Sequence, residues 1–288
     1  MNMFFLYQTI VSFLIIISPI IILYRLIKKK EDFTRFKEKF CFPTKKRIKG
    51  KLIWFHGASI GEIMSIVPLI KNYEKDSSIK QILLTSSTLS SSKIVKKFKF
   101  KKTIHQFYPI DHFFFTNKFI KYWNPAIAIF IESEIWPCMF KNLNDKGIPL
   151  ILLNARLTKK TFKKWMSIKG FARNIFNNIS IAYPQNLETL YFLKQMKSKK
   201  INLIGNLKFT ENYDEKHDNI SGKLKTQLKR KKIWVASSTH KNEEIFCAKT
   251  HIILKKKIKN LLSIIIPRHV HRTKKIINQI KNLNLNVV

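Results

Sequence analysis

The chain has 288 residues, 45% of them hydrophobic and 25% charged, which is typical of a globular protein and excludes a disordered or fibrous one. Lysine and arginine number 55 against 17 aspartate and glutamate, giving a formal net charge of +38. That excess favours a polyanionic partner such as nucleic acid, an anionic membrane face or a phosphorylated substrate, although a biased base composition of the gene would also scatter lysines over the surface.

The amino-terminal segment from residue 4 to 24 contains no charged residue and is long enough for one membrane-spanning helix, which needs about 20 apolar residues. Basic residues follow it over 25–30 and none precedes it, so the positive-inside rule places the rest of the chain in the cytoplasm. A secretory signal peptide would carry its charge before the apolar run. Gln8 and Pro19 leave a second arrangement open, a helix lying in the leaflet. Both arrangements predict a membrane anchor over residues 1–30.

The body of the chain begins with a polar, basic stretch at 31–50, which predicts a juxtamembrane connector. Beyond it, short apolar runs alternate with stretches of helical spacing. Strands are predicted at 52–55, 82–84, 126–131, 150–153, 179–182 and 201–204. Strands that alternate with helices argue for a mostly parallel sheet covered on both faces, so residues 31–209 are predicted to form a Rossmann-like domain.

A second alternation follows a polar, charged stretch at 210–232, which predicts a linker or a helical crossover. Its predicted strands and helices are 233–236, 242–256, 261–266 and 274–280. Residues 286–288 resemble the start of another strand. So few strand–helix units cannot complete an ordinary sheet, and residues 210–288 are therefore predicted to form an incomplete second Rossmann-like domain.

Candidate chemical residues follow the predicted strands, because ligands of open α/β sheets bind at the carboxyl ends of strands. The turn 56–62 (HGASIGE) ends at a helix start, where Glu62 could act as a general base or simply favour the positive helix end. Glu132 and Glu134 follow a strand, where paired carboxylates either bind a substrate or cap the next helix. Lys208 could neutralise a developing negative charge or be an ordinary solvated lysine.

In the second domain, the segments 237–240 and 267–269 stand directly after predicted strands. Hydroxyls and amides at a helix amino terminus suit a phosphate, and Arg268 adds a bidentate clamp. The same hydroxyls, at Ser238 and Thr239, could equally be a simple helix cap.

Metal-ligating residues give no comparable pattern. His269 and His271 have no evident third ligand, so no metal site is predicted. Cys41, Cys138 and Cys247 lie far apart and form no C-x-x-C pair, which indicates neither a disulfide framework nor zinc and favours a reducing compartment.

Short motifs at these strand ends occur in a specific order. They are HGASIGE at 56–62, IESEIWP at 131–137, LLNARLT at 152–158, GNLKF at 205–209, WVASSTHKNEE at 234–244 and IIPRH at 265–269. Each block alone is weak. Their order and approximate spacing behind an amino-terminal anchor resemble the Kdo (3-deoxy-D-manno-octulosonic acid) transferases of lipopolysaccharide biosynthesis, and the resemblance covers residues 1–288.

The resemblance implies an α/β glycosyltransferase of GT-B type, with two Rossmann-like domains, that moves Kdo from CMP-Kdo to lipid IVA, the lipid A precursor. In this family the acid that matches Glu62 is the catalytic base, and the residues that match Glu132 and Lys208 stabilise the transition state. The P-R-H block contributes to CMP binding. With the hydroxyls described above, the expected CMP-binding residues are Ser238, Thr239, His240, Arg268 and His269. No metal or other cofactor is expected, because lysine, arginine and helix amides can stabilise the phosphate leaving group.

The chain also departs from the family pattern. Family members continue beyond the position of Val288 with a glycine-rich stretch and an N-P-L-E type motif, so the second domain is expected to be truncated. Two alternatives stay open: an inactive remnant that keeps membrane or lipid A binding, and a basic nucleic-acid-binding protein. The apolar segment, the E-x-E turn and the lack of a nucleic-acid motif argue against the last. The expected partners are CMP-Kdo, lipid IVA and the anionic inner-membrane surface, with no specific nucleic acid and the catalytic body on the cytoplasmic side.

Overall fold

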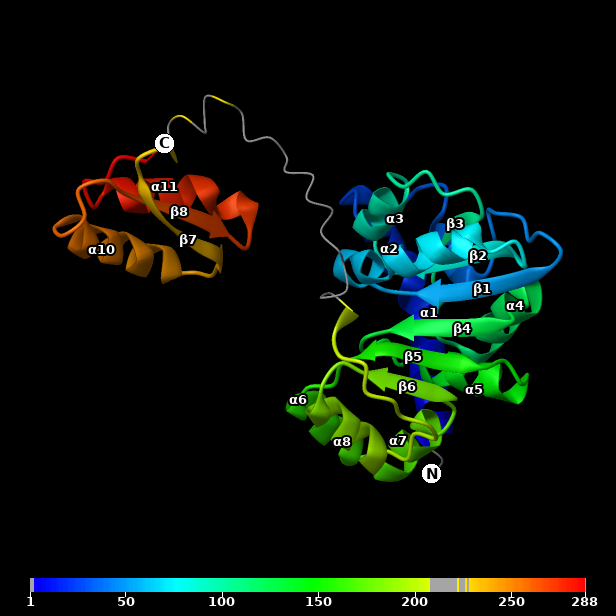
Figure 1. Cartoon of the computed structure of the whole chain (residues 1–288). Helices are drawn as coiled ribbons and strands as arrows, with labels where there is room; N and C mark the ends of the chain where they lie inside the picture. The colour runs from blue at the N-terminus through cyan, green and yellow to red at the C-terminus, as the bar shows by residue number, and fades with distance from the viewer. Residues whose placement is uncertain (1–2, 208–221, 223–225, 227, 288) are drawn as a thin grey trace. The chain divides into compact units, whose positions relative to one another are not determined.

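The computed structural model describes residues 3–207, 222, 226 and 228–287, and the chain divides into two compact units, Met1–Asn212 and Tyr213–Val288 (Figure 1). The predicted linker at 210–232 lies mostly outside the described residues. Each unit contains its own parallel sheet.

The first unit consists of α1 (Met3–Ile27), η1 (Phe36–Phe40), β1 (Lys51–His56), α2 (Ile60–Lys75), β2 (Ile79–Ser86), α3 (Leu89–Val95), β3 (Thr103–Phe107), α4 (Phe113–Trp123), β4 (Ile127–Ile131), α5 (Pro137–Asp145), β5 (Leu150–Ala155), α6 (Lys159–Met166), α7 (Lys169–Phe176), β6 (Ile181–Pro184) and α8 (Leu187–Gln195). The second unit consists of β7 (Lys232–Thr239), α10 (Glu243–Lys255), β8 (Leu261–Pro267), η3 (Val270–Arg272) and α11 (Thr273–Lys281).

The larger sheet has the strand order β3-β2-β1-β4-β5-β6, and every pairing in it is parallel. Successive residues of β1 enter different cores: Trp54 packs among the aromatic side chains on one face, while Phe55 packs with Ile63 and Ile66 of α2 on the other. Burial on both faces explains why the strands read as continuous apolar runs. The predicted parallel α/β architecture is confirmed, and the strand order reverses between β1 and β4.

In the first unit the sequence missed one strand, and one of its strand predictions was wrong. β3 was not predicted, because its centre is the polar pair His105 and Gln106. The apolar run 201–204 forms only a single bridge, from Ile201 to Ala182, and its remaining residues are exposed. In the second unit the strands and helices fall where the sequence predicted them, but residues 286 and 287 form no strand.

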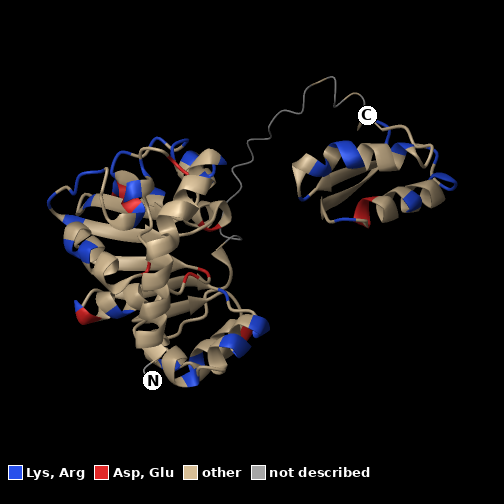
Figure 2. Cartoon of the chain, turned by 180° about the vertical axis from the view of Figure 1, so that it is seen from behind, with Lys and Arg blue, Asp and Glu red and all other residues tan. Residues whose placement is uncertain are grey.

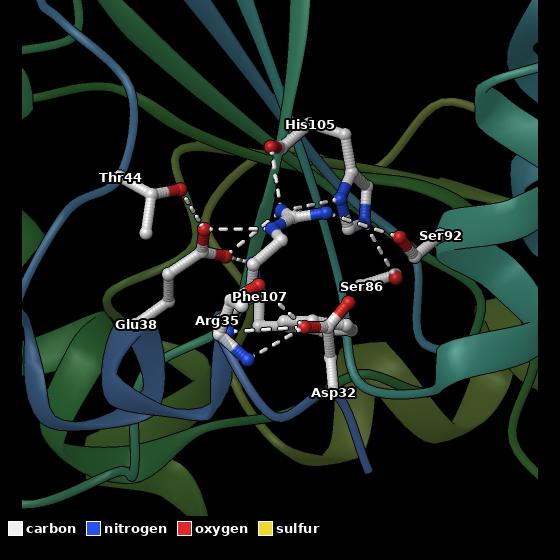
Figure 3. A network of polar contacts seen from close by, with 9 residues as sticks. Asp32, Arg35, Glu38, Thr44, Ser86, Ser92, His105 and Phe107 are labelled. Atoms are coloured by element: carbon white, nitrogen blue, oxygen red, sulfur yellow. Dashed lines mark hydrogen bonds and ion pairs between the residues drawn. The ribbon is translucent and has the colours of Figure 1, made fainter.

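The predicted connector is a structured part of the first unit, because an ion pair from it covers the outer edge of β3 (Figure 3). Arg35 donates to the carbonyl oxygen of His105 (2.9 Å), and the Glu38 carboxylate accepts from the backbone N–H of Phe107 (2.7 Å). The two side chains bind each other at 2.8 Å. Unpaired backbone groups on an edge strand need such partners, and here residues of η1 and its N-cap supply them.

Helix α1 is the one described helix that is long and apolar enough to cross a membrane, with a mean hydropathy of 2.5. It also packs against the rest of the first unit: Figure 2 shows it lying across that unit, and its one charged residue, Arg25, is in its last turn. The hydroxyl of Tyr7 donates to the Asp111 carboxylate (2.7 Å), which also accepts the backbone N–H groups of Cys138 and Met139 at the start of α5. Burial raises the pKa of Asp111 to about 6. The helix is thus tied to the unit by a buried polar contact.

The two sides of α1 differ in exposure. The side that faces the unit includes Tyr7, Val11, Ser18 and Ile22, at the three- or four-residue spacing of one helix face or multiples of it. The opposite side carries large exposed apolar side chains at the same spacing, namely Phe13, Ile16, Ile20, Leu23 and Ile27. An apolar stripe on the surface of an otherwise packed unit indicates contact with a membrane or with another protein.

Candidate active site

The candidate site lies where the strand order of the large sheet reverses, between the carboxyl ends of β1 and β4. His56 is the last residue of β1, Glu132 follows β4 directly, and Glu62 is in the first turn of α2. Crevices at such switch points are where open α/β sheets bind ligands. The structure therefore brings Glu62 and Glu132, which the sequence singled out, to one place.

Glu62 is held by the turn that precedes its helix. Its two carboxylate oxygens accept the backbone N–H of Ala58 (2.8 Å) and the hydroxyl of Ser59 (2.8 Å), while Ser59 caps the helix by accepting the Glu62 N–H. This is close to a capping box. A Cβ on Gly57 would lie 3.2 Å from the Cβ of Glu62, so the glycine lets the end of β1 approach the carboxylate closely.

The environment raises the pKa of Glu62. Burial is the largest cause, and the nearby charges of Glu134 and Glu132 add to it, while the hydrogen bonds from Ser59 and Ala58 oppose them. A carboxylate with a raised pKa is a better proton acceptor than an ordinary surface glutamate. The hydrogen bonds show Glu62 taking part in the helix cap, and its role as a base remains a prediction.

His56 and Glu134 are in contact with each other at the site. The buried His56 ring lies 3.2 Å from the Glu134 carboxylate through Nε2 and 3.0 Å from the Thr85 hydroxyl through Nδ1. Burial lowers the pKa of His56, which keeps the ring neutral, although Glu134 partly opposes the shift. The indole N–H of Trp136 donates to the same Glu134 oxygen (3.0 Å), and Tyr108 stacks on the imidazole with ring centroids 4.0 Å apart.

Two residues at neighbouring strand ends adopt the left-handed backbone conformation that is unusual for residues other than glycine. They are Glu132 (φ 55°) and Asn154 (φ 53°). Such conformations are unfavourable and concentrate at functional sites. The Asn154 side-chain oxygen accepts the backbone N–H of Leu207 (3.2 Å), and its buried Nδ2 has no partner within the described part of the chain. Lys208, the third predicted catalytic residue, lies outside the described residues.

In the second unit, the predicted nucleotide-binding residues gather at the carboxyl ends of β7 and β8. Ser238, His240, Arg268 and His269 are exposed, and Ser238 has a left-handed backbone (φ 58°). Thr239 differs from them, because it is buried and its hydroxyl donates to Glu244 (3.0 Å). A direct role for Thr239 in nucleotide binding remains a prediction.

The sequence did not identify the partners of Glu244 and Glu134. Arg272 binds the buried Glu244 at 3.0 Å and so joins η3 to α10. His56 escaped notice as a site residue because its partner Glu134 lies far along the chain; a histidine at the end of a fully buried strand was the available signal. Among the described residues, no group of three His, Cys, Asp or Glu side chains could hold a metal ion.

The fold and this site define a protein of the GT-B class, in which two Rossmann-like units follow one another. Solved structures support the fold. A UDP-GlcNAc 2-epimerase from Neisseria meningitidis matches 81% of this chain and 69% of its own at a TM-score of 0.54 and 12% identity. Another UDP-N-acetylglucosamine 2-epimerase matches 83% and 69% at a TM-score of 0.56 and 11% identity.

The family follows from the sequence comparisons. Residues 34–211 match the model of the 3-deoxy-D-manno-octulosonic-acid transferases (kdotransferase). Transferases of that name are 34% identical in Rickettsia felis, over 98% of this chain and 71% of theirs, and 36% identical in Rickettsia bellii, over 93% and 64%. The Haemophilus influenzae transferase is 31% identical over 76% of this chain and 52% of its own length. The chain belongs to the Kdo transferase family and spans about half to seven-tenths of the length of these relatives.

Proposed function

We propose that this chain transfers Kdo from CMP-Kdo to lipid IVA in lipopolysaccharide biosynthesis, with Glu62 as the general base. The observation that carries the proposal is the half-buried Glu62 carboxylate, whose pKa is raised, at the switch point of a Kdo transferase domain. A base poised in this way suits the deprotonation of a sugar hydroxyl.

The proposed reaction is a displacement at the anomeric carbon of Kdo. The acceptor hydroxyl oxygen forms a bond to that carbon, and its proton passes to Glu62. The bond from the carbon to the phosphate oxygen of CMP breaks, and its electron pair leaves with CMP. Glu132 supplies negative charge that favours an oxocarbenium-like transition state, while Lys208 and Arg268 stabilise the departing phosphate.

The donor residues belong to the second unit. Ser238 and His240 at the end of β7, with Arg268 and His269 after β8, offer hydroxyl, ring and guanidinium groups to the CMP phosphate. Thr239 supports them by holding Glu244, which in turn binds Arg272.

The direct test is transfer of labelled Kdo from freshly generated CMP-Kdo to lipid IVA by membranes that contain the full chain. Product formation that depends on both donor and acceptor would support the proposal. Absence of product from a folded, membrane-bound chain would contradict it and favour a protein that binds lipid A without turnover.

A pH profile tests the electrostatic part of the proposal. Because Glu62 must be ionised to accept a proton, the rate should fall as the pH drops through its raised pKa. Glu134→Gln removes a neighbouring negative charge, so it should lower the Glu62 pKa and move the acidic limb of the profile to lower pH. The matched control is Glu188→Gln, an exposed glutamate of α8, which should leave the limb in place. If the acidic limb of the pH–rate profile does not move in Glu134→Gln, the limb does not report the ionisation of Glu62.

The orientation of α1 is also part of the proposal: the helix lies in the plane of the cytoplasmic leaflet. Its inward side is bonded to the first unit through Tyr7 and Ser12, the latter 3.2 Å from His112, whereas a helix crossing the bilayer could not pack along a domain in water. Its outward apolar stripe suits the interface between headgroups and acyl chains, and the lysines at 28–30 suit anionic headgroups.

Single cysteines at the two ends of α1 distinguish this orientation from a spanning helix. In a Cys247→Ser background, where the remaining cysteines are buried, Met3→Cys and Lys28→Cys should both react with a membrane-impermeant maleimide added to inverted inner-membrane vesicles. Reaction at Lys28→Cys alone would show that the helix crosses the membrane. The background variant itself should stay unlabelled.

A further inference from the structure

A cavity lies at the outer edge of the large sheet, away from the candidate active site. It has a volume of about 480 Å³ and is lined by Thr34, Arg35, Thr44 and Lys45 and by seven of the residues from Val95 to His105. Ligand sites of proteins usually have about 300–1,000 Å³. Residues that follow the anchor helix therefore form one wall of a cavity large enough for a small ligand.

Three cationic side chains line this cavity, and among the described residues only one of them, Arg35, has a carboxylate partner. Arg35 is engaged by Glu38, Ser92 and His105 (Figure 3). The ammonium groups of Lys45 and Lys96 take part in no ion pair within the described part of the chain. Two lysines at one cavity thus have no carboxylate partner among the residues that the structure describes.

The carboxylates near the cavity are bound to other hydrogen-bond donors and form no ion pair with Lys45 or Lys96 among the described residues. Glu38 already accepts Arg35, the Phe107 N–H and the Thr44 hydroxyl. The other threonine hydroxyls of the cavity are bound to carboxylates as well, Thr34 to Asp32 and Thr103 to Glu74. Each of these carboxylates is held by hydrogen-bond donors of its own, so the lysines remain the groups available to an entering ligand.

The pKa of His105, which lines the cavity, is lowered in part by the positive charges around it. Burial and then the charges of Arg35, Lys96 and Lys45 lower the pKa of His105 to about 3. Its ring nitrogens are bonded to Arg35 (3.0 Å) and to the hydroxyl of Ser86 (2.9 Å). The ring therefore stays neutral at physiological pH and contributes no charge, and the potential around it is positive.

The segment that forms part of the cavity wall is also linked to the end of α1. Glu31 binds Arg25 at the end of α1 (3.1 Å) and Lys39 of η1 (2.6 Å), which ties the anchor to the wall that carries Arg35. Phe98 and Phe100 give the opposite wall an apolar surface, stacked with ring centroids 5.3 Å apart. Positive charge beside aromatic rings, at the end of a membrane-facing helix, matches a phosphate attached to a lipid.

We propose that this cavity binds the phosphomonoester headgroup of an anionic membrane lipid through Lys45 and Lys96. A phosphomonoester carries nearly two negative charges at neutral pH and offers acceptor oxygens to both lysines. The site holds the first unit at the membrane independently of the sugar-transfer site, which lies at β1 and β4. The proposal relies on the in-plane orientation of α1 but not on catalysis, so its test needs no CMP-Kdo.

The test is co-sedimentation of the full chain with phosphatidylcholine vesicles that contain either phosphatidic acid, a phosphomonoester, or phosphatidylglycerol, a phosphodiester. The unmodified chain should prefer phosphatidic acid. Lys45→Ala/Lys96→Ala should weaken binding to those vesicles by about tenfold or more, since each lysine near an anionic surface matters on the order of 1 kcal/mol. The matched control is Lys163→Ala/Lys194→Ala, which removes the same charge from exposed positions on α6 and α8 and should keep the preference.

Several outcomes would overturn the proposal. Equal losses in the two double variants would show a diffuse charge effect. No preference for phosphatidic acid over phosphatidylglycerol would exclude a phosphomonoester site. Binding of glycerol 3-phosphate in calorimetry, lost in Lys45→Ala/Lys96→Ala and unaccompanied by any vesicle preference, would assign the site to a soluble phosphate. Thermal unfolding of each variant should match the unmodified chain, which establishes that the lysines act on binding and not on folding.

Discussion

Replacing Glu62 by glutamine is expected to lower the turnover of Kdo transfer by about a hundredfold to ten-thousandfold, the usual contribution of a general base. Glutamine keeps the size of the side chain and an oxygen that can accept the Ala58 N–H, so the turn should survive. It cannot take a proton from the acceptor hydroxyl. The measurement is the rate of labelled Kdo transfer to lipid IVA at saturating CMP-Kdo.

Glu188→Gln is the matched control, because it makes the same chemical change in the first turn of another helix, at an exposed position. Its turnover should equal that of the unmodified chain. A second readout is the KM for lipid IVA, which should change little in Glu62→Gln if the residue acts on the proton and not on acceptor binding. Full turnover in Glu62→Gln would remove it from the mechanism and direct attention to Glu132 and Glu134.

The sequence predicted the parts of the fold that depend on local patterns. β1, β4 and β5 are buried on both faces, and their continuous apolar runs identified them. The rule that ligands bind at carboxyl ends of strands then led to Glu62 and Glu132, which the structure brings together. Both steps use only residues that are near one another in the chain.

The features that escaped prediction depend on contacts between distant residues. β3 contains His105 and Gln106 and has no apolar run. On its outer edge, the carbonyl oxygen of His105 accepts a hydrogen bond from Arg35, which lies 70 residues earlier in the chain. His56 and Glu134 are 78 residues apart, so no local spacing pairs them. A pattern within a short window cannot encode either contact.

Helix α1 shows the same limit of sequence-based prediction in another way. Uniform apolarity predicted a segment that could cross a bilayer, yet Tyr7, Ser18 and Arg25 fall on one stripe of the helix, because spacings of 11 and 7 residues are about three and about two helical turns. Polar groups gathered on one stripe are expected where a helix packs against protein. Average hydropathy conceals this arrangement, because it ignores which face each residue occupies.

Replacing Glu38 by alanine is expected to lower the free energy of unfolding of the first unit by about 3–5 kcal/mol, the usual loss when one member of a buried ion pair is removed. Glu38 is fully buried and binds Arg35 and the backbone N–H of Phe107. Without it, a largely buried guanidinium and a strand N–H lose their partner together. Urea unfolding in detergent, followed by tryptophan fluorescence in a Trp234→Phe background, reports on the first unit alone, since the other tryptophans lie there.

Asp145→Ala provides the contrast. It breaks the ion pair with Lys141, whose side chains are both 43% exposed, and exposed pairs of this kind contribute about 0–1 kcal/mol. The expected difference between the two variants arises from burial and from the β3 edge, since each loses one carboxylate. Equal losses would mean that the Arg35–Glu38 pair contributes no more than a surface pair and that the edge of β3 is stabilised by other contacts. A larger loss in Glu38→Ala would establish that the segment after α1 is required for the stability of the large sheet.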